Sequence, residues 1–178
     1  MNAMKHLLAG VRVVDFSRVL AGPYATAMLA DQGAEVIKIE MPGHGDDSRH
    51  LGPFTGTGSA YFTGLNRGKR SIEADLKDPD HHARLLQLIA DCDVVVENFR
   101  PGVAAKLGLS YEDVKAIKPD VIYASISGFG QHGAQSQRPA YDTVIQALSG
   151  LMASTGFPDG SPTRVGESIA DVSAGVFA

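Results

Sequence analysis

The sequence predicts a doubly wound α/β fold, in which helices cover both faces of a parallel sheet. Apolar runs of strand length recur along the chain, and helical stretches separate them. The runs are nearly continuous in Val and Ile, which is typical of strands buried on both faces. With 178 residues, of which 44% are apolar, the chain has the size of one domain and enough apolar side chains for a core.

Four segments have the strand pattern, namely residues 11–16, 34–40, 93–98 and 120–127. The first helix is expected to begin at Pro23, because proline is favoured at the first helical position, and to end at Gly33. Together with its two flanking strands, this helix makes a compact β-α-β unit.

Further helices are expected over residues 79–91, 110–118 and 143–154. In the second of these, Ser110 followed by Asp113 is a weak cap, and Pro119 stops the helix. Residues 42–70 are rich in Gly and polar side chains and are predicted to form a long irregular loop of the functional or mobile kind. A second polar loop covers residues 131–142.

Composition argues against nucleic acid and membranes as partners. The net charge is −4, and the chain has no basic cluster beyond residues 67–70. Arg12 and Asp15 interrupt the N-terminal apolar stretch, so no export segment or membrane span is expected. The single cysteine, Cys92, cannot form an internal disulfide, which suits a reducing compartment and makes the cytoplasm the expected location.

Several common chemistries lack their motifs. The turn after the first strand has one glycine where a dinucleotide fingerprint needs three, and no P-loop or G-x-S-x-G string is present. Cys92 precedes a buried strand, where a cysteine is more often a small core residue than a nucleophile. No metal site is expected, because the six histidines are scattered over positions 6, 44, 50, 81, 82 and 132.

Six strings resemble, in order and spacing, the family III coenzyme A (CoA) transferases, also called the CaiB/BaiF family. This family includes CoA transferases and α-methylacyl-CoA racemases. The strings are DFSRVLAGPYATAMLADQGAEVIKIEMPGHGD, NRGKRSIEADLKDPD, DVVVENFRPGVAAKLGLSYEDV, PDVIYASISGFGQ, YDTVIQALSGLMASTG and GESIADVSAG. The resemblance covers essentially the whole chain, and ENFRPG and NRGKRS are each unusual.

The resemblance implies a Rossmann-like, open and mostly parallel sheet with helices on both faces, as in the family's large domain. It also implies an interlocked homodimer, an acyl-CoA donor and a carboxylic acid acceptor, with the CoA thioester as substrate and no permanently bound cofactor. Members are roughly twice this length. Residues 1–178 are therefore expected to be the N-terminal part of a large domain, truncated before its natural boundary.

Asp171 matches the aspartate that attacks the thioester in the transferases. A carboxylate nucleophile converts a thioester into a mixed anhydride and so keeps the acyl group activated. The small residues Ala174 and Gly175 are expected to let backbone N–H groups approach the developing oxyanion. The alternative is that Asp171 is only an acid at a helix start, where the helix dipole favours it.

The resemblance assigns the CoA contacts to two loops at the carboxyl edge of the sheet, where open α/β folds bind ligands. For Arg100 and Lys106 the alternative is a solvated surface, and for Phe99 it is simple packing. The family keeps the basic turn at residues 66–70 near the CoA site, which implies a binding role here. The alternative is that this turn is only a solubilising loop. The expected CoA-binding residues are Val19, Leu20, Ala21, Asn98, Phe99, Arg100 and Lys106.

Tyr141 favours a transferase over a racemase. Racemases of this family carry a histidine base in a Gly-His-Asp string, where this chain has Ala140-Tyr141-Asp142. Tyrosine is a poor base near neutral pH. Met41 stands where formyl-CoA transferases have a nucleotide-binding arginine, so that contact with CoA is either lost or supplied by another residue. A racemase and a CoA-binding fragment without turnover are the two alternatives.

Overall fold

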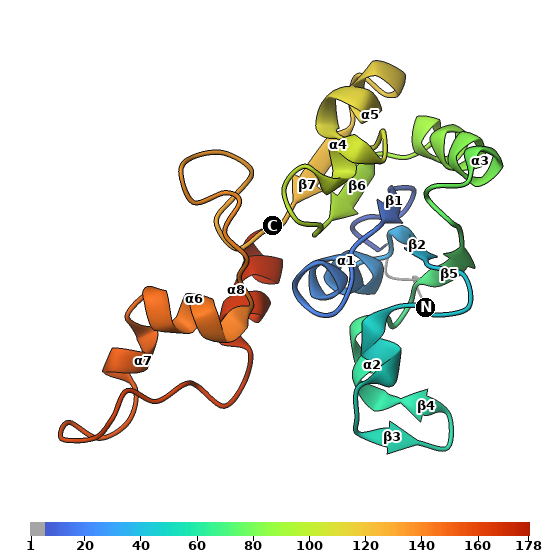
Figure 1. Cartoon of the computed structure of the whole chain (residues 1–178). Helices are drawn as coiled ribbons and strands as arrows, with labels where there is room; N and C mark the ends of the chain where they lie inside the picture. The colour runs from blue at the N-terminus through green and yellow to red at the C-terminus, as the bar shows by residue number, and fades with distance from the viewer. Residues whose placement is uncertain (1–5) are drawn as a thin grey trace.

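Five parallel strands form the sheet that positions the rest of the molecule (Figure 1). The computed structural model describes residues 6–178, and the N-terminal segment expected to carry no export signal lies partly outside this range. The strand order is β5-β2-β1-β6-β7. The strands are β1 (Arg12–Asp15), β2 (Glu35–Glu40), β5 (Arg70–Glu73), β6 (Val94–Glu97) and β7 (Ile122–Ser125). The predicted parallel α/β fold is confirmed.

The central strands are buried on both faces, which explains their continuous apolar runs. Val13 and Val14 of β1 are both fully buried, and they point to opposite faces because side chains alternate along a strand. The parallel register aligns Val13 with Val36 and with Val94, and Val14 with Val95. Rows of apolar side chains therefore cross the sheet on each face.

Helices cover the two faces of the sheet. Leu29 and Ala30 of α1 (Ala21–Asp31) pack with Val13 on one face. Leu85 and Ile89 of α3 (Pro79–Ala90) pack with Val14 on the other face, and α5 (Tyr111–Ile117) contributes to the same cluster. Figure 1 shows α1 and α3 on opposite sides of the strands. The result is the three-layer arrangement that the apolar pattern predicts.

The helix boundaries follow local sequence signals, but two of the predicted helices need correction. The first helix begins at Ala21, two residues before Pro23, which still lies in the first turn, where its missing N–H costs nothing. The capping box of Ser110 and Asp113 forms as predicted. The helix expected over residues 143–154 is instead two, α6 (Asp142–Leu148) and α7 (Leu151–Ser154), because Gly150 adopts a φ of 82° between them.

Residues 42–70 are more ordered than the long loop that composition predicts. They contain a 3-10 turn, η1 (Asp47–His50), the hairpin strands β3 (Phe54–Thr55) and β4 (Gly58–Ser59), and helix α2 (Ala60–Leu65). The edge strand β5 begins at residue 70, and all four of its residues are exposed. Because β5 lacks an apolar run, the strand pattern does not reveal it.

The last helix joins two parts of the molecule. Helix α8 (Ile169–Phe177) packs on α1 and also contacts α6, while α6 and α7 lie away from the sheet (Figure 1). A Cβ atom on Gly175 would lie 2.5 Å from the Ala21 carbonyl oxygen, so only glycine permits this approach. The short α4 (Val103–Lys106) follows β6. Within residues 6–178, no helix combines the length and hydrophobicity that crossing a membrane requires.

Candidate functional site

A cavity of about 320 Å³ opens at the carboxyl ends of the central strands. The loop after β1 and the loop after β6 form two of its walls. Strands β2 and β6 lie on either side of β1, so the chain order reverses at β1. This reversal is the place where open α/β sheets bind ligands. Further walls come from the segment after β7, from residues 136–145 and from the first turns of α8.

The structure brings six of the seven expected CoA-binding residues to this cavity, together with Asp171. Val19, Leu20 and Ala21 line it from the loop after β1. The other three are Asn98, Phe99 and Arg100, from the loop after β6. Their roles stay predictions, but the shared location is what the family resemblance implies.

Lys106 lies elsewhere. It is exposed at the end of α4 and borders a separate, open hollow with His82 and Leu107. The chain between Asn98 and Lys106 turns away from the cavity into α4, so nearness in sequence does not place them in one site. A ligand would have to extend along the surface to contact both.

Asn98 acts within the protein. Its side-chain oxygen accepts the Arg18 backbone N–H at 2.8 Å, and its side-chain nitrogen donates to the Arg18 carbonyl at 2.7 Å. This paired bond fixes the loop after β1 to the loop after β6. The Arg18 guanidinium remains half-exposed, 3.8 Å from Asp47 and 5.9 Å from the centre of the Phe99 ring.

Asp171 lies in the first turn of α8 and lines the cavity. Its carboxylate is half-buried and makes no hydrogen bond or ion pair with any other residue in the described range 6–178. Burial raises the pKa of the Asp171 carboxyl above its ordinary value, and the nearby charge of Asp142 raises it further. Within the described residues, Asp171 is therefore an acid without a side-chain partner, held at the cavity wall.

Asp142 caps the helix that carries Asp171. One oxygen of its buried carboxylate accepts the backbone N–H of Ala170 at 2.8 Å and that of Asp171 at 3.3 Å. The other oxygen accepts the Gln146 side-chain amide at 2.6 Å. Gln146 is fully buried and also bonds the backbone at Val165 and at Glu167. Two side chains of α6 thus fix the start of α8.

Gly175 has a packing role that the sequence interpretation missed. We expected it to let backbone N–H groups approach an oxyanion, but it is buried against α1, where a Cβ would meet the Ala21 carbonyl. Ala174, one residue earlier, does line the cavity.

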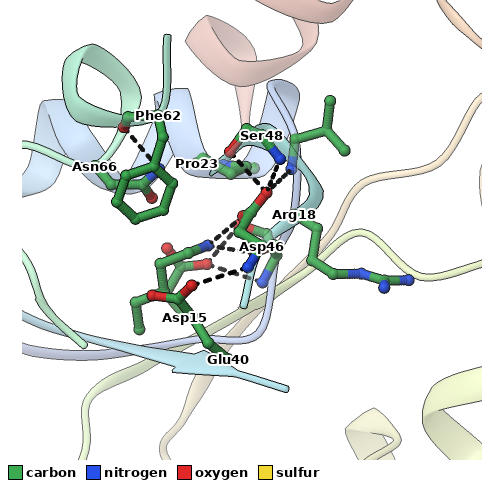
Figure 2. A network of polar contacts seen from close by, with 12 residues as sticks. Asp15, Arg18, Pro23, Glu40, Asp46, Ser48, Phe62 and Asn66 are labelled. Carbon is green, nitrogen blue, oxygen red and sulfur yellow. Dashed lines mark hydrogen bonds and ion pairs between the residues drawn. The ribbon is translucent and has the colours of Figure 1, made fainter. Parts of the chain in front are cut away.

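A buried polar cluster lies behind the loop after β1. Figure 2 shows Asp15, Glu40 and Asp46 converging there, while the Arg18 side chain points away from them. Lys69 pairs with Asp15 at 3.0 Å, and Lys38 pairs with Asp46 at 2.7 Å. All four of these paired side chains are at most 1% exposed.

The charges in this cluster shift each other's pKa values. Burial alone would raise the pKa of Asp15, but the ammonium groups of Lys69 and Lys38 outweigh it and hold the pKa below the ordinary value. The same balance, with Lys38 as the main cation, lowers the pKa of Asp46. Burial lowers the pKa of Lys69 to about 8, against the raising effect of Asp15. Both carboxylates are therefore ionised near neutral pH.

In the basic turn at residues 66–70, the Lys69 side chain is buried in the protein and does not face solvent or a ligand. Lys69 donates to Asp15, to the Pro23 carbonyl and to the Asn66 side chain. Arg67 pairs with Asp31 on α1. The turn thus docks on α1, a tertiary contact that its composition does not reveal.

Cys92 is a fully buried residue of the core, as predicted. Burial raises the pKa of its thiol to about 11, so the reactive thiolate is scarce near neutral pH.

Comparison with known proteins gives a consistent assignment. The sequence profile of CoA-transferase family III matches residues 8–178. The chain is 54% identical over 169 residues to the acetyl-CoA:oxalate CoA-transferase of Acetobacter aceti, a match that covers 94% of this chain and 43% of that protein. It is 50% identical over 179 residues to the succinyl-CoA:glutarate CoA-transferase of Homo sapiens, covering 100% of this chain and 41% of that protein.

A solved structure gives the same result. The crystal structure of a CaiB/BaiF family protein from Brucella suis superimposes with a TM-score of 0.93 at 44% identity, covering 98% of this chain and 47% of that one. The chain thus spans less than half the length of the proteins it matches. The extent of the profile match, together with these identities, establishes that the chain belongs to CoA-transferase family III.

Proposed function

We propose that the protein containing this chain transfers CoA from an acyl-CoA to a carboxylic acid, with Asp171 as the acyl carrier. The observation that carries the proposal is the Asp171 carboxylate itself, which is half-buried and lines the cavity at the chain reversal. The names of two relatives, acetyl-CoA:oxalate and succinyl-CoA:glutarate CoA-transferase, support this class of donor and acceptor.

The chemistry proceeds by acyl transfer to a carboxylate. An Asp171 oxygen attacks the thioester carbonyl carbon, the C–S bond breaks, and CoA leaves as a thiolate while a mixed anhydride forms. The thiolate then attacks the Asp171 carbonyl, which releases the donor carboxylate and gives an aspartyl-CoA thioester. The acceptor carboxylate and the thiolate repeat the two steps in reverse order, so the products are a new acyl-CoA and free Asp171.

An unpartnered carboxylate suits this role better than a paired one. An ion pair or several donated hydrogen bonds would stabilise the carboxylate and reduce its nucleophilicity, and Asp142 already satisfies the N–H groups of the first turn. The half-buried position limits access of water, which would hydrolyse the anhydride.

Three arginines line the same cavity, namely Arg18, Arg100 and Arg138. Guanidinium groups form strong, charge-assisted bonds with phosphate oxygens, and CoA carries a diphosphate and a 3′-phosphate. We assign CoA contacts to Val19, Leu20, Ala21, Phe99 and Arg100, with Asn98 holding the loop. Lys106 would contact the distal part of the ligand along the surface.

A racemase is the second candidate, and Tyr141 speaks against it. Tyr141 is 78% exposed at the cavity rim, where family racemases present a histidine base. Exchange of the α-proton of an acyl-CoA in deuterium oxide separates the two reactions, since a transferase need not exchange it. Fast exchange that survives removal of all carboxylic acid acceptors would favour the racemase.

For the whole protein we propose an interlocked homodimer in the cytoplasm, with residues 1–178 as the N-terminal part of its large domain. The family resemblance supports the dimer, and Cys92, the one cysteine of these 178 residues, is a free buried thiol, which suits a reducing compartment. Sedimentation of the protein expressed from its whole reading frame measures the assembly.

The decisive experiment traps the acyl-enzyme. The protein expressed from its whole reading frame is incubated with acetyl-CoA or succinyl-CoA and then with hydroxylamine, and its peptides are sequenced by mass spectrometry. We expect a hydroxamate at Asp171 that depends on acyl-CoA. Asp47→Asn is the matched control, because Asp47 is the other carboxylate on the cavity wall, and this variant should still be labelled at Asp171. Labelling only at another residue would refute the assignment.

A further inference from the structure

The backbone at Val19 is held in a conformation that its side chain disfavours. Its φ is 68°, and it is the one non-glycine residue with positive φ among residues 6–178. Valine is β-branched, so its side chain crowds the backbone in this left-handed region. Such strain persists only where the surroundings impose it, and it concentrates at functional sites. Val19 lies on the cavity wall, so the question is what imposes it.

Asp46 supplies one restraint. Its Oδ1 atom accepts the Val19 backbone N–H at 3.1 Å, and the same oxygen accepts both the backbone N–H and the hydroxyl of Ser48 at 2.8 and 2.7 Å. The Asp46 backbone N–H is in turn bound by the Glu40 carboxylate at 2.8 Å. Figure 2 shows this convergence behind the loop. Asp46 is 1% exposed, so water does not reach its hydrogen bonds in this structure.

Lys38 supplies a second restraint on the other side of Arg18. Its ammonium group donates to the Ser17 carbonyl at 2.8 Å and lies 2.7 Å from Asp46 Oδ2. One end of the Lys38–Asp46 pair therefore holds the carbonyl before Arg18, and the other end holds the N–H after it. Between them, Asn98 holds both backbone groups of Arg18 itself.

Stability alone does not account for a buried pair of this kind. The desolvation penalty of two buried charges consumes much of their mutual attraction, and an apolar pair of similar volume often serves stability equally well. What an apolar pair cannot do is donate to the Ser17 carbonyl and accept from the Val19 N–H. The pair is thus specific for the geometry of the loop.

We propose that the Lys38–Asp46 pair is a positioning device that holds Val19 in the left-handed conformation, so that the Arg18–Ala21 loop presents its side chains to CoA. Neither Lys38 nor Asp46 is among the residues lining the cavity, so both act through the loop. The inference rests on the proposed function, since it takes CoA as the ligand of this cavity.

The test uses the protein from its whole reading frame and measures the Kd of CoA by calorimetry. Lys38→Met combined with Asp46→Leu replaces the two charged side chains by apolar ones and so removes both restraints on the loop. We expect CoA to bind this variant about tenfold more weakly. Val19 itself lines the cavity, so each Val19 variant is compared with and without the pair substitutions. In the Val19→Gly background the pair substitutions should weaken CoA binding far less than tenfold, because glycine adopts the left-handed conformation without strain. In the Val19→Ala background, which also removes side-chain bulk but keeps a Cβ, the loss should stay closer to tenfold.

The inference is overturned if V19G does not reduce the loss, or if V19A reduces it as much as V19G, because then strain at Val19 is not what the pair controls. If the pair had a purely structural role, V19G would not restore CoA binding better than V19A. If the K38M/D46L protein does not fold, Asp46→Ala, which removes the acceptor of the Val19 N–H, replaces it in the same comparison. Failure of the unmodified protein to bind CoA would overturn the proposed function and this inference together, whereas normal binding without this difference between V19G and V19A overturns this inference alone.

Discussion

The Asp142 carboxylate accepts the backbone N–H of Asp171 at 3.3 Å while its charge acts on the Asp171 side chain. The two acids thereby divide two roles that the sequence leaves open for Asp171 alone. Asp142, on α6, satisfies the start of α8, and the Asp171 carboxylate is left to face the cavity. The geometry therefore separates the acid that caps from the acid that is available to react.

The first prediction concerns the pH dependence of kcat/KM. If Asp171 is the nucleophile, as we propose, it must be ionised, so the rate falls as the pH drops through the pKa of Asp171. Burial and the Asp142 charge both raise that pKa, so the fall begins at a higher pH than for an ordinary aspartate. Asp142→Asn removes the second cause, and we expect the acid limb of the profile to move to lower pH.

The control for this shift is Asp47→Asn. Asp47 borders the same cavity, but its charge does not contribute to the raised pKa of Asp171. The acid limb should stay in place in this variant, whatever happens to the KM. An acid limb that moves equally in both variants would show that the general potential of the cavity, rather than Asp142, sets the pKa.

The second prediction concerns two helical glycines. A Cβ on Gly22 would lie 2.2 Å from the Ser17 Cβ, so Gly22→Ala must displace the loop after β1. We expect a loss of about 1–3 kcal/mol in unfolding free energy and weaker binding of CoA. Gly64→Ala is the matched control, because nothing lies within 4 Å of its added Cβ, and it should be neutral or slightly stabilising. Urea unfolding of both variants compares them, and equal losses would contradict the contact argument.

The sheet was predictable where burial leaves a mark on sequence. The runs at β1 and β6 are apolar because both faces are covered, and the cap at Ser110 is local. The edge strand β5 was missed because its residues are exposed and its pairing with β2 is a long-range contact. Similarly, the break at Gly150 depends on a backbone conformation that a glycine permits but does not dictate.

The site was predictable in part for a related reason. Loops that follow neighbouring parallel strands must meet at one edge of the sheet, which places Val19 and Asn98 together. Asp171 was predicted as a site residue only through the resemblance of its sequence string to the family. Asp142 and Asp46 were missed because their partners lie 29 and 27 positions away and no local pattern encodes such bonds. Arg138 was missed because it lies in a polar loop whose path only the fold determines.

The third prediction tests whether CoA extends beyond the cavity. Arg100 lines the cavity, while Lys106 borders the separate hollow beside His82. If the nucleotide runs along the surface between them, Arg100→Met and Lys106→Met should each raise the KM for acyl-CoA several-fold and leave kcat nearly unchanged. The increase should shrink at high salt, since screening weakens exposed charge pairs.

Lys115→Met is the control for this pair, because Lys115 is on α5 and borders neither the cavity nor the hollow. Its KM should match that of the unmodified protein. A normal KM in the Lys106 variant would remove Lys106 from the binding site and confine CoA contacts to the cavity.

The last prediction concerns the apolar layer between α3 and the sheet. Leu85 of α3 is 2% exposed and packs in the cluster that contains Val14 and Val95. Leu85→Ala leaves a hole in that layer and should cost about 2–5 kcal/mol of unfolding free energy. Leu7→Ala removes the same atoms from a side chain that is 86% exposed, and should change stability by less than about 0.5 kcal/mol. Urea denaturation followed by circular dichroism measures both changes. Similar midpoints for the two variants would mean that α3 does not pack on the sheet as described, and the three-layer arrangement behind the cavity would have to be abandoned.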